Sequence, residues 1–375
     1  MISDKKSKKF KKDYRERKER KNYSERKLDK TNKHSSKKKS LFHNKNINKK
    51  FFEERIIKNI SKFLIIFLLI TTILFCNFLS QDEIEKDNYG LSLEQKMEDY
   101  ATKKFAVFKR SNEPKCGLFS FYIIHLGCIN EYLKKGYIPI ADLQSFKNRY
   151  NLGNTSINNL WELFFHQPNN YTLKEANKYA KNIKHFKCNP KSYPSDRSIY
   201  NDSQSINFWH NLAKQYMPVK HNIMNEVKKN MKRLFGNSKS ILGVKIRGTD
   251  YIKGQPKNHP VQPPVDMVIS DVKIFDEKYK YDFIFFAAED EKIRNKFLSS
   301  FDKRVKTLSL KNVKLIKKYN DEVNEVLNNM KNYLMNIIIL SKCLDIITSR
   351  TSGAAGIFIL TEGFRHYKTY YLGYY

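Results

Sequence analysis

The chain has 375 residues, which is enough for two domains with appendages. Its net charge is +33, and residues 1–62 carry 24 Lys and Arg against 8 Asp and Glu, so about half of the excess lies there. None of the five cysteines belongs to a Cys-x-x-Cys pair or to a Cys/His spacing typical of zinc, which argues against a structural zinc site. The four cysteines after residue 80 permit disulfides.

The basic segment 1–62 has few apolar residues and no repeating apolar face. It cannot bury enough apolar surface to offset the entropy lost on ordering, so we expect it to be disordered. A nucleic-acid-binding arm is one interpretation of such a tail. A cytosolic tail that precedes a membrane anchor is the interpretation that the next segment favours.

Residues 63–79, "FLIIFLLITTILFCNFL", contain no charged side chain. At ~1.5 Å per residue they would extend roughly 26 Å as a helix, near the short limit for a bilayer span. A buried core helix is the alternative, but this stretch lacks the polar face that such a helix usually has. The basic excess precedes the span and acidic residues follow it, which predicts a type II signal anchor with a cytosolic N-terminus. In a eukaryote this topology fits a Golgi membrane, and in a bacterium the cytoplasmic membrane.

Residues 80–104 are charged and mostly polar, which predicts a stalk, and the composition becomes globular from Phe105. An N-terminal domain over 105–238 begins with a glycine turn at Gly117, followed by a predicted helix over 119–135 and a strand over 137–143. Helical patterns also occur at 173–183 and 222–235. A Gly-Asn-Ser break at 236–238 marks the predicted end of this domain.

The C-terminal domain, 239–375, alternates apolar strand patterns with helical ones. The apolar runs lack a polar alternation, which is typical of strands covered on both faces, so the pattern predicts an α/β fold with a doubly wound parallel sheet. The predicted strands are 240–246, 281–288, 304–310, 344–349 and 367–373, and the predicted helices begin at Glu291, span 321–343 and span 353–363.

Polar side chains follow three of these strands, where ligands of such sheets bind. They are Arg247, Gly248, Thr249 and Asp250 after the first strand, Glu289 and Asp290 after the second, and Arg350, Thr351, Ser352 and Gly353 after the fourth.

These residue types suit a nucleoside diphosphate. The helix that opens at Ser352 offers free N–H groups and a partial positive charge, and Arg247 offers a planar cationic fork for phosphate oxygens. Glu289 and Asp290 can accept hydrogen bonds from a ribose or a base.

Each of these features also has a purely structural interpretation. Arg247 could pair with Asp250, and Ser352 suits a helix N-cap. The acidic run 289–291 could bind a metal or simply favour the first turn of a helix. His259, before a proline, could be an ordinary loop histidine. The coincidence of several such groups at one sheet edge is what favours a ligand site.

The segment 243–260, "GVKIRGTDYIKGQPKNHP", resembles the first motif of the GDP-fucose-dependent fucosyltransferases of the α1,6 and nodulation-enzyme type. Their pattern is roughly G-V-H-V-R-R-T-D, with His-Pro nine residues after the aspartate, as at His259. "FFAAEDEKI", "LSKCLDIITSRTSG" and the glycine loop with the helix after it at 116–143 are similar to further segments of that family. The resemblance covers about residues 105–375.

The resemblance implies a GT-B architecture, with two Rossmann-like domains, the donor in the C-terminal one, and no required metal. It implies that Arg247, with Gly248 beside it, binds the donor β-phosphate. It also implies that Thr351, Ser352 and Gly353 hold phosphate and that Glu289 and Asp290 contact the nucleotide.

The chain departs from the family pattern at four positions. Lys245 stands where the family has His, Gly248 replaces a second Arg, and Asn336 replaces an aspartate that contacts the nucleotide. Gln255 stands where the α1,6 enzymes have a glutamate that can act as a base.

We therefore expect a membrane-anchored fucosyltransferase that acts on a glycan, with Arg247 in catalysis and Asp250 or His259 as the base. The alternatives are a transferase that uses another nucleotide sugar and a carbohydrate-binding protein of the same fold without catalysis. We expect no nucleic-acid partner.

Overall fold

The computed structural model describes residues 67, 71, 92–113, 115–151, 158–195, 199–200, 202–308 and 319–375; the side chains of 249–250 and 319–323 lie outside this description. Residues Tyr89–Tyr375 form one compact unit. The predicted tail lies outside the described residues, as does the predicted span 63–79 apart from Phe67 and Thr71. Within the described part, no helix combines the length and the apolar character that crossing a bilayer requires.

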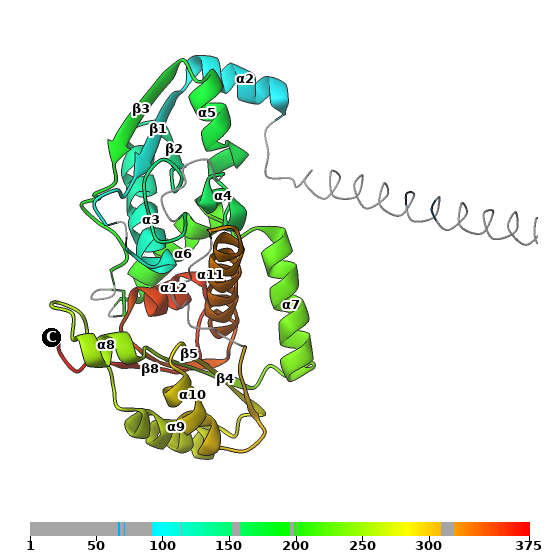
Figure 1. Ribbon diagram of the computed structural model, residues 1–375, viewed down its shortest axis with the longest axis vertical. Helices are drawn as coiled ribbons and strands as arrows, with labels where there is room; N and C mark the ends of the chain where they lie inside the picture. The colour runs from blue at the N-terminus through cyan, green and yellow to red at the C-terminus, as the bar shows by residue number, and fades with distance from the viewer. Residues whose placement is uncertain are drawn as a thin grey trace, which may run out of the picture. The chain divides into compact units, whose positions relative to one another are not determined.

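The N-terminal half is built on a three-stranded parallel sheet in the order β2-β1-β3 (Figure 1). Its strands are β1 (Lys104–Lys109), β2 (Tyr137–Ala141) and β3 (Asn182–Lys187). Helix α3 (Leu118–Lys134) follows Gly117 and is buried along most of its length, because its apolar residues cover nearly its whole circumference. The predicted helix and strand at 119–143 are confirmed to within two residues.

The predicted stalk is wrong over its last part. Residues Leu93–Thr102 form helix α2, which starts with a capping box between Ser92 and Gln95. Tyr100 of this helix is buried against Phe105 and Tyr171, so α2 belongs to the compact unit. One buried aromatic ring anchors a helix whose average composition is that of a solvated segment.

Short helices also belong to this half: α4 (Leu160–Phe164), the 3-10 helix η1 (Pro168–Asn170) and α5 (Leu173–Tyr179). The helix predicted over 173–183 ends early, since Asn182 already pairs with β1. A disulfide joins Cys128 in α3 to Cys188 just after β3, across 60 residues of sequence.

The C-terminal half contains a five-stranded sheet in the order β6-β5-β4-β7-β8, and every strand pair is parallel. This confirms the predicted parallel sheet. Its strands are β4 (Ile241–Ile246), β5 (Phe283–Ala288), β6 (Val305–Lys306), β7 (Asp345–Ser349) and β8 (Tyr367–Tyr370). The strand predicted at 304–310 is described as two residues only, and residues 309–310 lie outside the description.

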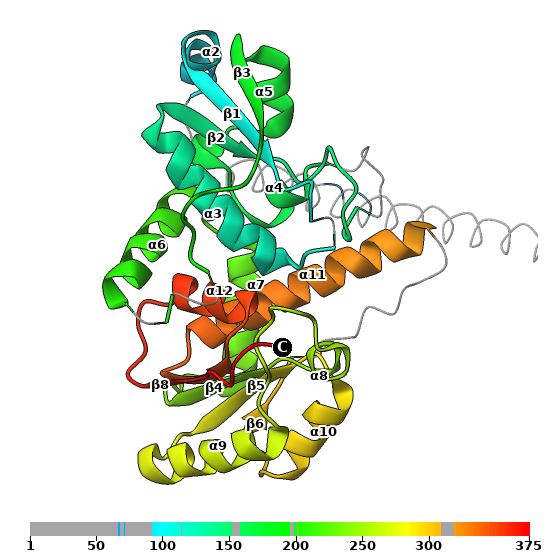
Figure 2. The ribbon, with the colours of Figure 1, turned by 90° about the vertical axis from the view of Figure 1, so that its left-hand side faces the viewer.

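Both faces of this sheet are buried, as the unbroken apolar runs predicted. Leu242 and Val244 pack in one cluster, whereas Ile241 and Phe285 pack in another. Figure 2 shows α9 (Val265–Tyr279) and α10 (Glu291–Ser299) on one face, with α11 (Tyr319–Ser341) and α12 (Ser352–Leu360) on the other.

The predicted domain boundary at 238/239 falls between the two sheets, but helices from both sides of it pack together. Helix α12 contacts α3 and α6 (Ser203–Tyr216), and α11 contacts α7 (His221–Phe235). At the α12–α3 contact, a Cβ atom added to Gly356 would lie 2.1 Å from a ring carbon of Phe119, so only glycine fits there.

Candidate functional site

The strand register brings three strand ends to one level. Lys245 in β4 pairs with Thr348 in β7, so Arg247 and Arg350 leave their strands side by side at the carboxyl edge. The β4–β5 register places Glu289 at the same level. The strand order reverses between β4 and β7, and open α/β sheets bind ligands at such a switch point.

Arg247 lies at the centre of this edge. Its Nη1 donates to Glu289 Oε1 at 2.7 Å, and its guanidinium lies over the ring of Tyr251, 5.2 Å from the centroid. Tyr251 belongs to the short helix α8 (Thr249–Gly254) and in turn meets the His259 ring edge-on at 5.3 Å. The sequence allowed an Arg247–Asp250 pair, but the ion pair found here is with Glu289, and the Asp250 side chain lies outside the described residues.

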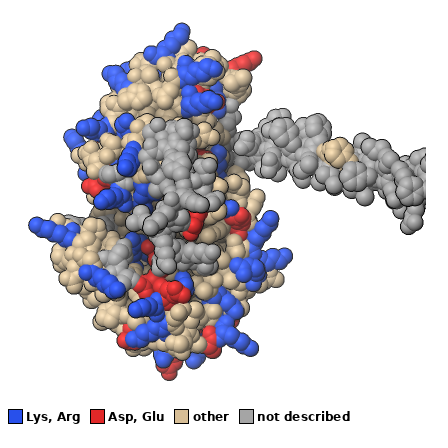
Figure 3. Space-filling view, viewed as in Figure 1, with Lys and Arg blue, Asp and Glu red and all other residues tan. Residues whose placement is uncertain are grey.

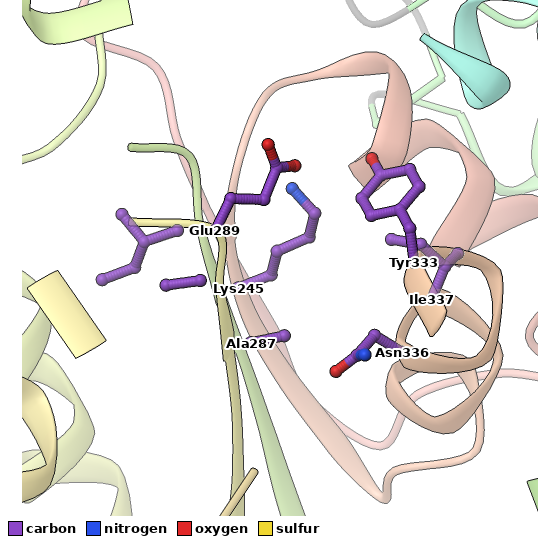
Figure 4. A pocket seen from close by; sticks show the side chains of 8 residues that line it. Lys245, Ala287, Glu289, Tyr333, Asn336 and Ile337 are labelled. Carbon is purple, nitrogen blue, oxygen red and sulfur yellow. The ribbon is translucent and has the colours of Figure 1, made fainter. Parts of the chain in front are cut away.

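A small cavity lies beside this pair, between β4, β5 and α11 (Figure 4). Its polar lining comes from Lys245, Glu289, Tyr333 and Asn336, and Figure 4 shows the Lys245 amine between the Glu289 carboxylate and the Tyr333 ring. Burial and the Glu289 charge raise the pKa of Tyr333 well above its usual range, so its hydroxyl stays protonated.

Asn336 turns a hydrogen-bond acceptor into this cavity. Its side chain is 1% exposed, and its Nδ2 donates to the Asn332 carbonyl at 2.8 Å. Its Oδ1 is buried and accepts no hydrogen bond within the described part of the chain. A buried acceptor of this kind is costly unless a ligand or water donates to it.

The start of α12 lies against two of the side chains that line this cavity, Lys245 and Tyr333. Thr351 is the N-cap, and its hydroxyl accepts from the Ala354 N–H at 3.1 Å, which leaves the first N–H groups of the helix for another acceptor. A Cβ atom on Gly353 would lie 2.3 Å from the Tyr333 hydroxyl and 3.5 Å from the Lys245 amine. A larger residue at 353 would therefore force the Tyr333 side chain to move from its place beside the helix start.

Two of the predicted site residues have structural roles. Asp290 is the N-cap of α10 and accepts from the Ile293 N–H at 3.0 Å. Gly248 packs directly on it, since a Cβ atom there would lie 2.5 Å from the Asp290 Cβ. The nucleotide contact expected of Asp290 stays a prediction. His259 is exposed, with Nδ1 3.1 Å from the Lys257 carbonyl oxygen.

Two residues of the cavity were not chosen as site residues from the sequence. Lys245 was noted only as a departure from the family pattern, although it sits in a fully buried strand, where a lysine is unusual. Tyr333 precedes Asn336 by three residues on α11, one helical turn, and this spacing is the signal that could have found it. Within the described residues, no group of three or more His, Cys, Asp or Glu side chains could hold a metal ion.

The fold and the site together show the class of protein: it is a two-sheet α/β protein with a polar site at the switch point of its C-terminal sheet. No protein-family model and no curated protein matches the sequence.

Among solved structures, the chain is similar to NodZ alpha-1,6-fucosyltransferase co-crystallised with GDP (10% identity, 69% of this chain and 93% of that chain, TM-score 0.44). It is also similar to fucosyltransferase NodZ from Bradyrhizobium (11%, 69% and 94%, 0.42) and to POFUT1 in complex with GDP (9%, 71% and 73%, 0.36). The NodZ structures are fucosyltransferases, the class of enzyme that the motif at 243–260 resembles.

Proposed function

We propose that the protein is a membrane-anchored glycosyltransferase that moves fucose from GDP-fucose to a glycan hydroxyl. The observation that carries the proposal is the meeting of Arg247, the start of α12 and a buried polar cavity at the switch point of one parallel sheet. An arginine and the N–H groups at a helix start suit a diphosphate, and the buried Asn336 Oδ1 suits a ligand group that donates a hydrogen bond.

Transfer requires the acceptor oxygen to lose its proton and bond to the anomeric carbon while the bond from that carbon to the β-phosphate oxygen breaks. Negative charge grows on the β-phosphate as GDP leaves. Arg247 and the N–H groups at the start of α12 stabilise that charge more in the transition state than in the bound donor. Because Arg247 is paired with Glu289, the phosphate takes the place of the carboxylate on the guanidinium.

Asp250 and His259 are the proposed proton acceptors. The exposed imidazole of His259 sits on Tyr251, which lies under Arg247, so the loop that carries it borders the phosphate site. Gln255 cannot accept a proton in this way. The reaction needs a base within hydrogen-bond reach of the acceptor hydroxyl.

The proposed topology is type II, with residues 63–79 in the bilayer and the sheets on the far side. The Cys128–Cys188 disulfide supports an oxidising compartment for this part of the chain, since such bonds are rare in reducing cytosol. The membrane is that of the Golgi in a eukaryotic host and the cytoplasmic membrane in a bacterial one.

A second candidate is a carbohydrate-binding protein that has the fold but no transferase activity, or a transferase for another nucleotide sugar. The Arg247–Glu289 ion pair favours the carbohydrate-binding protein, because the side chain proposed to bind phosphate is already paired with a carboxylate. Asn336 favours a transferase for another nucleotide sugar, because a neutral amide oxygen then stands where the resembled family has an aspartate that contacts the nucleotide.

The test uses the full chain, purified in detergent, with GDP-fucose and a mixed glycan acceptor. GDP, UDP, GMP and guanosine are compared by the melting temperature of the protein, because a ligand that binds the folded state raises it. Arg247→Ala should reduce kcat/KM for fucose transfer by about a hundredfold to a thousandfold while the chain stays folded. The matched control is Arg233→Ala, an exposed arginine on α7 whose partner is Asn230.

No transfer and no shift with any nucleotide would exclude a nucleotide-sugar enzyme. Binding of GDP without transfer to any acceptor would favour the carbohydrate-binding alternative. A larger increase in melting temperature with UDP than with GDP would indicate that the donor is a UDP-sugar, and the proposed reaction would still be sugar transfer.

A further inference from the structure

Tyr371 is a large aromatic side chain that stays exposed at the carboxyl edge of the C-terminal sheet. It directly follows β8, and 55% of its surface is exposed. The β7–β8 register places it level with Arg350, and the β4–β7 register places Arg350 level with Arg247. The backbone at Tyr371 is therefore two strands from Arg247 along the same edge, roughly 10 Å away at the usual strand spacing. This separation places Tyr371 beside the proposed phosphate site rather than in it.

Contacts on one side hold this ring in a fixed orientation. The Arg350 guanidinium lies 4.5 Å from the Tyr371 ring centroid, and the Tyr374 ring meets it edge-on with the centroids 5.7 Å apart. The guanidinium also lies 5.3 Å from the ring centroid of Tyr200, a buried tyrosine whose hydroxyl donates to the Thr351 carbonyl at 3.2 Å. Because the guanidinium occupies one face of the Tyr371 ring, the exposed part is the other face and the edge. A ring that is fixed before a ligand arrives loses little entropy on binding.

The segment that carries Tyr371 runs beside the loop of a proposed base. The Tyr375 N–H donates to the His259 carbonyl at 3.0 Å, and the Val261 N–H donates to the Gly373 carbonyl at 3.0 Å. These bonds join the segment after β8 to the loop after α8. In the proposed reaction the acceptor hydroxyl gives its proton to a base in this region, so a ring on the paired segment lies on the side of the acceptor.

A fixed, exposed aromatic ring beside a sugar-transfer site suits a carbohydrate. A pyranose carries C–H groups on the faces of its ring, and their partial positive charge meets the negative face of an aromatic ring favourably. The contact also removes apolar surface of both partners from water. Around α8, the visible surface carries mainly uncharged side chains with a few projecting Lys or Arg (Figure 3), which suits a neutral ligand.

We propose that the exposed face of Tyr371 is an acceptor subsite, which stacks against a pyranose ring of the glycan while a hydroxyl of that glycan faces the base. The inference rests on the proposed function, because it assigns the acceptor side of the same reaction. The ligand class is a neutral oligosaccharide with an open C–H face. An acyclic polyol has similar hydroxyl groups but no such face, so its binding should not depend on this ring.

The experiment measures cellobiose binding to the full chain with and without GDP, by NMR titration in a detergent whose headgroup is not a sugar. Sorbitol is the acyclic comparison. Tyr371→Ala should weaken cellobiose binding about fivefold to thirtyfold, the loss expected for one stacked ring face, and leave GDP binding unchanged. Tyr371→Phe keeps the ring and should bind cellobiose as the natural chain does. The matched control is Tyr367→Ala, which removes a tyrosine that is 48% exposed at the other end of β8 and should leave cellobiose binding unchanged.

Three results would overturn the subsite. The first is equal cellobiose affinity of the natural chain and Tyr371→Ala, and the second is cellobiose binding no tighter than that of sorbitol. The third is an equal loss of cellobiose and GDP affinity in Tyr371→Ala, which would show that the ring only positions Arg350. If neither GDP nor UDP binds while cellobiose binding still depends on the ring, the proposed transfer fails and the subsite stands, so the two failures are distinguishable.

Discussion

Acidification should destabilise the N-terminal half through one residue, His125, which is buried there as a neutral imidazole. It is fully buried in α3, with ring centroids 5.2 Å from Phe108 and 4.8 Å from Trp161. Neither ring nitrogen has a hydrogen-bond partner among the described residues. Burial, with a smaller contribution from the Arg110 charge, lowers the pKa of His125 from 6.5 to about 3.

The direction of this pH effect on stability follows from the number of protons bound in the folded and unfolded states. Between pH 6.5 and about 3 the unfolded chain binds a proton at His125 and the folded chain does not, so the free energy of unfolding falls as the pH decreases. The slope approaches ~1.4 kcal/mol per pH unit, and the loss between pH 7 and pH 5 is about 2 kcal/mol. Above about pH 8, His125 is neutral in both states and adds no further pH dependence to the free energy of unfolding.

The assay is urea denaturation of the full chain at pH 7 and pH 5, compared with His125→Phe. The variant should lose about 2 kcal/mol less than the natural chain over this interval, whatever its stability at pH 7. Groups that titrate in both proteins cancel in the difference. His185→Phe, at an exposed position on β3, is the matched control and should keep the natural pH dependence. Equal slopes for the natural chain and His125→Phe would refute the buried neutral imidazole.

Three further outcomes are expected. Gly353→Ala should abolish donor binding, because the added methyl group meets the Tyr333 hydroxyl at 2.3 Å; a Gly353→Ala, Tyr333→Phe double variant should restore part of it, as measured by the GDP-induced melting shift. Reduction of Cys128–Cys188 should lower the free energy of unfolding by about 4 kcal/mol, the chain-entropy value for a loop of 60 residues, measured by denaturation with and without reductant. Lys245→Met keeps the length of the buried side chain but removes its charge, and it should weaken GDP binding more than guanosine binding. If the variant binds GDP as tightly as the natural chain does, this amine does not face the phosphates.

The parallel sheet could be predicted from the sequence because its strands are buried on both faces, which leaves unbroken apolar runs such as 241–246. Residues that directly follow strands could be placed at one sheet edge from the sequence, and the β4–β7 register confirms that placement for Arg247 and for the turn before α12. Their role in ligand binding stays a prediction.

The remaining features depend on contacts between distant segments, which no local pattern contains. Tyr333 reaches the cavity from α11, and Tyr200 reaches Arg350 from the other half of the chain. The burial of Tyr100, which makes α2 part of the fold, likewise depends on Tyr171, far away in sequence.

The glycine contact between α12 and α3 constrains how the molecule can move. Because the backbone at Gly356 lies directly against the Phe119 ring, α12, which starts at the proposed donor site, is held against the half that carries the other sheet. A wide hinge opening between the halves would have to pull this contact apart. Entry and exit of a bound nucleotide should therefore depend on rearrangement of the α8 loop and the segment after β8, and hydrogen exchange should be faster in those two stretches than at the α12–α3 junction.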